Sequence, residues 1–264
     1  MKKVFYCLIL MLLFGCGKED VEPQLPKIYE YRVNSMLYPI KASHISSKVK
    51  LNYDKDSRIV HRIGDLISVN PNSGVSYVLS ENIADTLIYK GNSIVITKHI
   101  VTGENWLTSY RRELLIKDGM LVRKVFDDDY YGMDYYGVND FDTVLYYYNG
   151  YKQVEKTSAL NPYRQMDSKF KYDENGNLSM VVSETYYRDT NDTFYKDTLR
   201  FSDYDNSPNL TKELILFEEC FFRSLSVNNF RKYSFKRVNL ENDQVSTEER
   251  SWAFYYDENN YVIY

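Results

Sequence analysis

Cysteine is scarce in this 264-residue chain, which contains three: Cys7, Cys16 and Cys220. Because the first two lie close to the start, only Cys220 remains over the rest of the chain, which excludes an internal disulfide framework there. Cys220 follows two glutamates and precedes two phenylalanines, and acidic or apolar neighbours raise the pKa of a thiol. We therefore predict a buried structural cysteine rather than a catalytic nucleophile.

Sequence motifs for catalysis and metal binding are also lacking. The three histidines, His44, His61 and His99, show no metal-ligand spacing, and neither a Gly-x-Ser-x-Gly elbow nor a phosphate-binding glycine loop occurs. Paired carboxylates could hydrolyse a glycan on a β scaffold, but among 37 acidic residues some pair always exists. We expect no cofactor, no metal site and no catalytic residues. The alternative is an envelope glycoside hydrolase that uses such a pair.

Long hydrophobic runs are lacking except at the start of the chain. Val4 to Leu13 is an apolar stretch that follows Lys2 and Lys3. As a helix it would rise about 15 Å, whereas crossing a bilayer takes about 20 residues. The short length and the basic start are typical of a secretory signal peptide, so we assign residues 1–15 to a cleaved signal.

The end of this stretch, Leu13-Phe14-Gly15-Cys16, resembles the lipobox of bacterial lipoproteins, although its second residue is bulkier than usual. The resemblance implies cleavage before Cys16 and attachment of lipid, including palmitate, to that cysteine. Two or more acyl chains hold a protein stably on a bilayer. Residues 16–27 are polar and contain Pro23 and Pro26, which predicts a flexible tether. The alternatives are an ordinary signal peptide and an N-terminal anchor helix.

The tether begins with Gly17-Lys18-Glu19-Asp20, which resembles the acidic export signal of surface lipoproteins in the Bacteroidota. The resemblance implies an outer-membrane lipoprotein displayed on the cell surface, and a periplasm-facing lipoprotein with a generic polar tether is the alternative. The chain has 33 basic and 37 acidic side chains, a formal net charge of −4. This acidic balance argues against nucleic acid as a partner and against adhesion to anionic lipid by charge.

Alanine, the strongest helix former, is scarce after the signal, whereas the chain has 27 tyrosines and 13 phenylalanines. Aromatic side chains favour the half-buried surface of a β-sheet. Polar and apolar residues alternate strictly over 47–53 and 168–172, which is the period of a strand with one buried face. We predict a single all-β domain over residues 28–264.

Tight polar turns separate the predicted strands at recurring places. Asp118-Gly119 and Asn149-Gly150 are the pairs that a two-residue type I′ hairpin requires. Other turns follow an aromatic residue and precede an aliphatic one, as in 53–59, 172–178 and 256–262. A series of such hairpins forms an antiparallel β-meander of about ten or more strands, and a sheet of that size tends to curl. The predicted architecture is one large curved sheet or incomplete barrel.

Two known families share features with this domain. The segment 172–178, Tyr-Asp-Glu-Asn-Gly-Asn-Leu, resembles the YD repeats of Rhs-type proteins. A closer similarity is to Bacteroidota lipoproteins of unknown function with a porin-like fold, in the lipobox, the serial Tyr-Asp turns, Asp203-Tyr204-Asp205-Asn206-Ser207-Pro208-Asn209 and Leu225-Ser226-Val227-Asn228-Asn229. The similarity covers residues 40–264 and departs at Phe230, where proline is common. It implies an all-β fold and no known catalytic residues.

The segment 127–142 is rich in acidic residues and tyrosines. Its six acids could ligate Ca²⁺, but their spacing is not that of an EF-hand, and we favour a hairpin loop with a solvated acidic face. Exposed aromatic rings stack on sugars and contact protein partners, whereas buried rings pack on the sheet. The candidate ligand-contact aromatics are Tyr130, Tyr131, Tyr135, Tyr136, Trp106 and Trp252.

Three Asp-Thr-aliphatic triplets resemble the acceptor of O-glycosylation in the Bacteroidota. The candidate acceptors are Thr86, Thr143 and Thr198, and ordinary strand sequence is the alternative interpretation. A glycan would place these hydroxyls on the outward face of the sheet. The sequence as a whole predicts a membrane-anchored lipoprotein with a non-enzymatic binding or structural role, whose partner is a glycan or an envelope protein.

Overall fold

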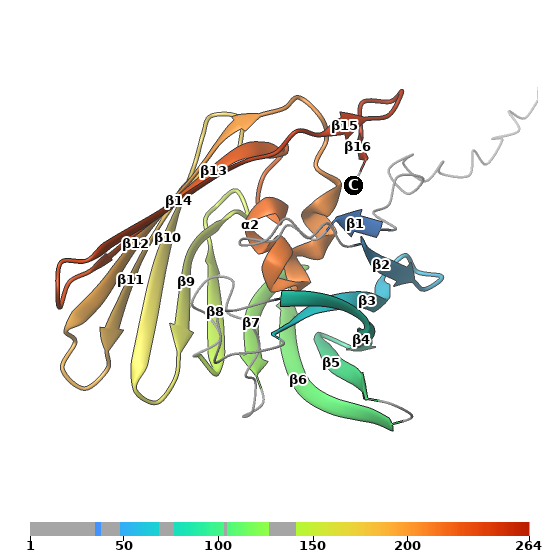
Figure 1. The fold of residues 1–264 in the computed structure, drawn as a ribbon, viewed down its shortest axis with the longest axis horizontal. Coiled ribbons are helices and arrows are strands. Elements are labelled where there is room, and N and C mark those ends of the chain that lie inside the picture. The colour runs from blue at the N-terminus through green and yellow to red at the C-terminus, as the bar shows by residue number, and fades with distance from the viewer. Residues whose placement is uncertain (1–34, 38–47, 69–76, 103–104, 127–140, 264) are drawn as a thin grey trace, which may run out of the picture. The chain divides into compact units, whose positions relative to one another are not determined.

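The computed structural model describes residues 35–37, 48–68, 77–102, 105–126 and 141–263, all within one compact unit, Val33–Tyr264 (Figure 1). Fourteen strands in this described part pair into one sheet, and two more form a separate hairpin. In chain order the elements are β1 (Ser35–Leu37), β2 (Lys48–Tyr53), β3 (Ile59–Ser68), β4 (Tyr77–Lys90), β5 (Ser93–Thr102), β6 (Asn105–Lys117), β7 (Met120–Phe126), β8 (Thr143–Tyr148), β9 (Val154–Leu160), β10 (Arg164–Tyr172), β11 (Leu178–Tyr187), β12 (Thr193–Tyr204), η2 (Leu210–Leu216), η3 (Glu218–Cys220), α2 (Phe221–Ser224), β13 (Phe230–Asn239), β14 (Val245–Ser251), β15 (Tyr255–Tyr256) and β16 (Val262–Ile263).

The large sheet is an antiparallel meander in which the strand order equals the chain order, from β1 to β14. No pairing joins β1 to β14 within the described residues, so the sheet is open. Figure 1 shows it curving around the short helices η2, η3 and α2. The prediction of an all-β antiparallel meander in one large curved sheet is confirmed.

Four turns in the described part share one geometry, and they start at Asp54, Asn149, Asp173 and Asp257. In each turn the side-chain Oδ1 of the first residue accepts backbone N–H groups from the residues two and four positions later. The residue three positions later has a positive φ, as Ser57 does at 67°. Asp or Asn starts these turns because its short side chain can replace a missing backbone acceptor.

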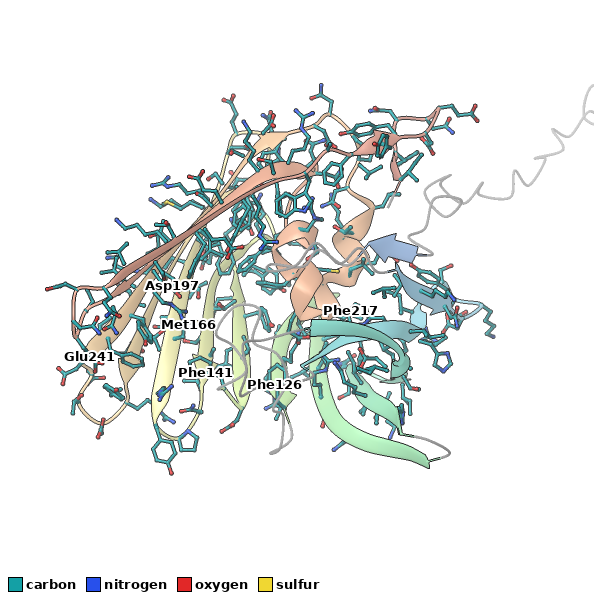
Figure 2. All side chains as sticks on the ribbon, viewed as in Figure 1. Phe126, Phe141, Met166, Asp197, Phe217 and Glu241 are labelled. Carbon is teal, nitrogen blue, oxygen red and sulfur yellow. The ribbon has the colours of Figure 1, made fainter. Side chains whose placement is uncertain are left out.

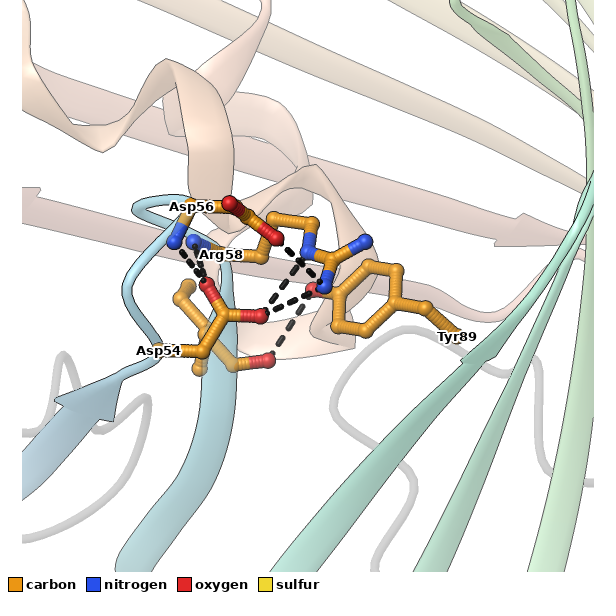
Figure 3. Close-up of polar contacts among 5 residues, drawn as sticks. Asp54, Asp56, Arg58 and Tyr89 are labelled. Carbon is orange, nitrogen blue, oxygen red and sulfur yellow. Dashed lines mark hydrogen bonds and ion pairs between the residues drawn. The ribbon is translucent and has the colours of Figure 1, made fainter.

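The turn at Asp54 shows the arrangement in detail (Figure 3). The N–H groups of Asp56 and Arg58 both donate to Asp54 Oδ1 over 2.9 Å. Those backbone bonds, with the Arg58 guanidinium, lower the pKa of the Asp54 carboxyl. The guanidinium also lies 4.7 Å from the ring centroid of Tyr89, whose hydroxyl donates to the carbonyl of Ile59 over 2.9 Å.

The type I′ turn predicted at Asp118-Gly119 is confirmed, because both residues have positive φ, 52° and 75°. The equivalent prediction at Asn149-Gly150 is wrong. There the positive φ belongs to Lys152, at 58°, because the Asn149 side chain accepts the N–H groups of Tyr151 and Gln153 and closes a longer turn.

A one-residue bulge follows four of the hairpin turns. In β10–β11, for example, Tyr172 pairs with Leu178 and Lys171 with Met180, which leaves Ser179 as the extra residue. The same register shift occurs in β2–β3, β6–β7 and β8–β9. The extra residue reverses the alternation of buried and exposed side chains along the second strand of each hairpin. As a result, the buried aliphatic residue after the turn is followed, three positions later, by a second buried residue: Arg62, Lys124, Thr157 or Val181.

Tyrosine hydroxyls connect successive hairpins at the same end of the sheet. Tyr148 donates to the carbonyl of Leu121 over 2.8 Å, and Tyr172 donates to that of Val154 over 3.0 Å. Tyr204 makes the equivalent bond to Leu178. Burial raises the pKa of Tyr148 and of Tyr204 to about 12, so both stay neutral donors at physiological pH.

The connection between β12 and β13 carries the three short helices, which the sequence pattern did not predict. We call residues 205–229 the inner segment, and the sheet face on which it packs the inward face. Leu214, Leu216 and Phe217 join the hydrophobic core of the first strands, and Phe221 and Phe222 also pack on the core of the later strands. Cys220 is buried within this packing, as predicted.

Buried amide and carboxylate groups hold the two ends of the inner segment together. Asp205 Oδ1 accepts the backbone N–H of Asn229 over 3.0 Å. The Asn209 side chain donates to the carbonyls of Arg223 and Ser226 over 2.7 and 2.9 Å. The motif residues at 203–209 and 225–229 therefore shape the fold of this segment.

The predicted signal at 1–15, the lipid-bearing Cys16 and the tether at 16–27 lie outside the described residues. Within the described part, no helix has the length and hydropathy that a membrane crossing requires.

Candidate functional site

Five charged side chains meet between the inward face of the first strands and the inner segment. Four come from strands of the first half of the sheet and are at most 3% exposed: Arg62 on β3, Asp85 on β4, Arg112 on β6 and Lys124 on β7. The fifth is Glu218 on η3. Buried charges are costly unless they are paired, so such a cluster is the first place to look for a function.

Asp85 lies between the two arginines of the cluster. Its Oδ2 is 3.4 Å from Nε of Arg62 and 3.3 Å from Nη2 of Arg112. Arg62 and Asp85 are also directly opposite each other in the β3–β4 register, so the pairing of these strands brings the two charges together. Asp85 is therefore held as a counter-ion of two buried cations.

Glu218 joins the inner segment to the same cluster. Its carboxylate accepts hydrogen bonds from Arg112 and, over 2.7 Å, from Lys124. Burial alone would raise the pKa of Glu218, but the charges of Arg112 and Lys124 outweigh burial and hold the pKa well below its usual range. Glu218 is thus an ionised structural acceptor.

Two further contacts tie this cluster to the inner segment. Lys124 donates to the carbonyl of Leu216 over 3.2 Å. The Arg62 guanidinium lies 4.9 Å from the ring centroid of Phe217, within reach of a cation–π contact. The five charges together connect β3, β4, β6 and β7 to η2 and η3.

A second polar group crosses the inward face on the later strands. It consists of one residue from each strand from β9 to β13, and each residue lies directly opposite the next in the strand register: Thr157, Ser168, Ser183, Asp197 and Arg237. Ser168 and Ser183 share a hydrogen bond of 2.8 Å. Asp197, labelled in Figure 2, accepts both arms of Arg237 at 2.8 Å each, the bidentate geometry that favours ion pairing.

The contacts within these two groups are ion pairs and hydrogen bonds. A general acid needs a raised pKa, whereas the charges of Arg112 and Lys124 hold the pKa of Glu218 well below its usual range. No group of three or more His, Cys, Asp or Glu in the described part could hold a metal ion. The arrangement supports rigid packing of the inner segment on the sheet.

The predicted ligand-contact aromatics are placed only in part. Tyr130, Tyr131, Tyr135 and Tyr136 lie outside the described residues, and Trp106 is a residue of β6 paired with Val101 on β5. The ring of Trp252 packs edge-on against Phe230 at a centroid distance of 5.7 Å, with the Arg223 guanidinium 5.3 Å from its centre. Trp252 therefore contributes to the core of the later strands, and its contact with a ligand stays a prediction.

The three candidate glycosylation threonines lie on the outward face of β4, β8 and β12. Thr86 is flanked by buried Asp85 and Leu87, and Thr198 by buried Asp197 and Leu199. Because successive side chains of a strand point to opposite faces, both threonine side chains lie on the outward face. In these two triplets the aspartate is an inward ion-pair residue. Glycan attachment at Thr86, Thr143 or Thr198 stays a prediction.

The sequence pattern did not identify Arg62, Arg112, Lys124 or Glu218. A strict two-residue period counted from Ile59 places Arg62 on the outward face, where an arginine is an ordinary surface residue. The bulge at Val60 reverses that assignment. A cation at the third position after the aliphatic residue, seen twice in Arg62 and Lys124, is the signal that would have found the cluster.

Two solved structures are similar to this chain at low sequence identity. One is a porin-like protein from Bacteroides vulgatus, 13% identical, with a TM-score of 0.47 over 83% of this chain and 86% of that chain. The other is a porin-like protein from Bacteroides uniformis, 12% identical, with a TM-score of 0.45 over 84% of this chain and 82% of that chain. No family model and no curated protein matches the chain.

Proposed function

We propose that this chain is an outer-membrane lipoprotein, held by lipid on Cys16, whose β domain has a non-enzymatic binding or structural role at the cell surface. The observation that carries the proposal is the packing of the inner segment on the inward face. Asp85 and Glu218 are used there as counter-ions of Arg62, Arg112 and Lys124. Contact with a partner then falls to the outward face, the turns and the strand edges.

The outward face of the later strands suits contact with water and with polar partners. Charged side chains alternate with the buried ones along β10 to β13, where Lys169, Glu184, Lys196 and Lys236 are all exposed. Charges of this kind are costly on a strand surface that faces lipid. We therefore propose that this domain stands in water on its tether, with a glycan or an envelope protein as its partner.

Anchoring is tested by replacing the cysteines one at a time in the full chain. Cys16→Ser should abolish labelling by a palmitate analogue and release the protein from washed membranes, because no acylated residue remains. Cys220→Ser is the matched control and should leave labelling and membrane association unchanged, since Cys220 is buried in the folded domain. Retention of the Cys16→Ser protein on membranes, with its signal cleaved, would contradict the lipid anchor.

Surface display is tested with the acidic segment after the lipidated cysteine. Replacing Glu19 and Asp20 by alanine should preserve the lipid label but remove accessibility to protease on intact cells. Unchanged accessibility would favour a different export determinant, and protection of the native chain from the protease would favour the periplasm-facing alternative.

The role of the domain is tested with protein that lacks residues 1–16. It should bind an envelope protein or a glycan from a defined panel and should release no sugar from the same glycans. Binding to nothing, together with cleavage of a glycan, would overturn the proposal in favour of the hydrolase.

A further inference from the structure

The two edges of the large sheet differ in a way that matters for association. One edge is β1, with three residues, and the other is β14, with seven. No strand within the described residues pairs with the outer side of β14. The exposed backbone of a long edge strand is a template for another strand.

The hydrogen-bond phase of β14 identifies the backbone groups on its outer side. Trp252 donates to the carbonyl of Arg231, and Asn239 donates to that of Gln244, which fixes the residues that face β13. Because antiparallel pairs alternate, the residues between them turn their N–H and C=O groups outwards. The outward-turned residues are Val245, Thr247, Glu249 and Ser251.

Three features by which natural proteins protect an edge strand, namely proline, lysine and a β-bulge, are absent from this strand. β14 contains no proline and no lysine, and its register with β13 runs from Val245 to Ser251 without a shift. Valine and threonine within it favour extended structure. Its charges are Glu248 and Arg250 on the inward side, which form an ion pair with each other within the strand, and Glu249 on the outward side. Because Glu248 and Arg250 have opposite charge, the two residues can also complement each other between two copies of the strand.

We propose that β14 pairs antiparallel with β14 of a second copy of this chain, about a two-fold axis at Glu249. The pairing gives three hydrogen-bonded residue pairs, with Glu249 opposite its own copy and Thr247 opposite Ser251 in both directions. Glu248 then faces Arg250 of the second copy, twice. A two-fold contact of this kind closes on itself and produces a dimer.

Charge selects this register over its neighbours. An axis at Glu248 would oppose two glutamates, and an axis at Arg250 would oppose two arginines. An axis at Thr247 would leave Glu248 opposite Ser246. Only the axis at Glu249 places opposite charges across the non-hydrogen-bonded positions, where side chains come closest.

The cost of this register is the pair of Glu249 side chains on the outward face. Lys232 and Lys236 of β13 lie diagonally across from each Glu249, since they pair with Ser251 and Thr247. Diagonal neighbours are within reach of long side chains, so the two lysines offset part of the repulsion. The proposal adds a self-association surface to the proposed function and does not depend on the lipid anchor.

Single cysteines along the edge of the full chain in detergent test the register. Glu249→Cys should form a disulfide-linked dimer on oxidation, because paired residues at an axis lie about 5.5 Å apart, within disulfide range. Val245→Cys is the matched control, since its copy would lie roughly 27 Å away. The unchanged sequence gives the background of its own cysteines.

Equal cross-linking at positions 245 and 249, or none at either, overturns the proposal. Cross-linking that is strongest at Thr247→Cys also overturns it, because the axis would then lie where the charges do not match. The oxidised Glu249→Cys dimer should be absent when Thr247→Pro is added. Proline there removes an outward N–H and leaves the bonds to β13 intact.

Charge exchange separates a second copy from a different partner. Glu248→Arg and Arg250→Glu should each weaken dimerisation about tenfold in sedimentation, and the double variant should return to within about threefold of the original. Circular dichroism checks that each variant is folded. A double variant that stays monomeric overturns the proposal and favours an edge that accepts a strand of another protein.

Discussion

Glu218 is the residue through which the inner segment meets two buried cations, and its replacement tests how the cluster works. Glu218→Gln should destabilise the protein by about 3 kcal/mol, because Arg112 and Lys124 would keep their charges without that counter-ion. Urea unfolding measures the loss. Glu213→Gln is the matched control, since Glu213 is exposed on the adjacent η2, and it should change stability by less than about 0.5 kcal/mol. Equal effects of the two variants would show that the cluster contributes nothing specific.

The pH dependence of stability follows from the same residue. The pKa of Glu218 is lowered in the folded protein, so its contribution is complete above the ordinary carboxyl range, near 4.5, and is lost as pH falls below it. The difference in unfolding free energy between the native chain and Glu218→Gln should be constant from pH 7 to about 5 and should narrow at lower pH. Unfolding curves over that range check the sign. A difference that widens on acidification would mean that Glu218 is protonated in the folded state.

At the scale of the elements, the strands could be predicted from the sequence but their faces could not. Alternation over 168–172 and the turn at Asp118-Gly119 are local signals, and the structure agrees with both. A bulge adds one residue and exchanges the two faces of everything beyond it. Because of the bulges at Val60 and Val122, the alternation pattern does not predict that Arg62 and Lys124 lie on the inward face. No period in the sequence announces such a shift.

The inner segment could not be predicted from the sequence for a different reason. Its helices are short, three to seven residues, and helices of that length are not stable by propensity alone. They form because Leu214 and Phe217 are buried against strands far away in the sequence. Glu218 could not be recognised as a site residue either, since both of its cationic partners lie on distant strands.

The turn between β10 and β11 offers a test of how a hairpin turn packs against the inner segment. Gly176 has a φ of +80°, and a Cβ there would lie 3.2 Å from Cγ2 of Val227 on the inner segment. Gly176→Ala should therefore destabilise the protein by about 1 kcal/mol or more, measured by urea unfolding. Gly150→Ala is the control, because no atom lies within 4 Å of its Cβ position, and it should be neutral or slightly stabilising. Equal losses would mean that alanine fails at both turns for a reason other than backbone conformation.

At the scale of the whole domain, the residues that the structure describes hold two hydrophobic cores on one sheet. One core joins the early strands to Leu214, Leu216 and Phe217, and the other joins the later strands around Phe170 and Phe201. Phe221 and Tyr148 pack against both cores. The fold class could be predicted from tyrosine content, alternation and turns, because a meander uses only contacts between neighbours in the chain. The contacts of the inner segment with both cores could not be predicted, since they join residues that lie far apart in the sequence.

Phe221 is the residue through which the two cores should unfold together. Its ring contacts Tyr146 on β8 and Phe170 on β10, with centroids 5.7 and 6.1 Å away. Phe221→Ala should cost about 2 kcal/mol, and it should speed amide hydrogen exchange in β6 and β7 as well as in β11 and β12.

Phe194→Ala is the matched control for this prediction. Phe194 is buried and stacks on Tyr187 at a centroid distance of 4.5 Å, but it belongs to neither core. Its loss should cost stability to a similar extent while β6 and β7 keep the exchange rates of the native chain relative to global unfolding. If Phe221→Ala speeds exchange only in β11 and β12, the two cores unfold independently. The inner segment would then be an attachment to the later strands rather than the element that couples the two halves of the sheet.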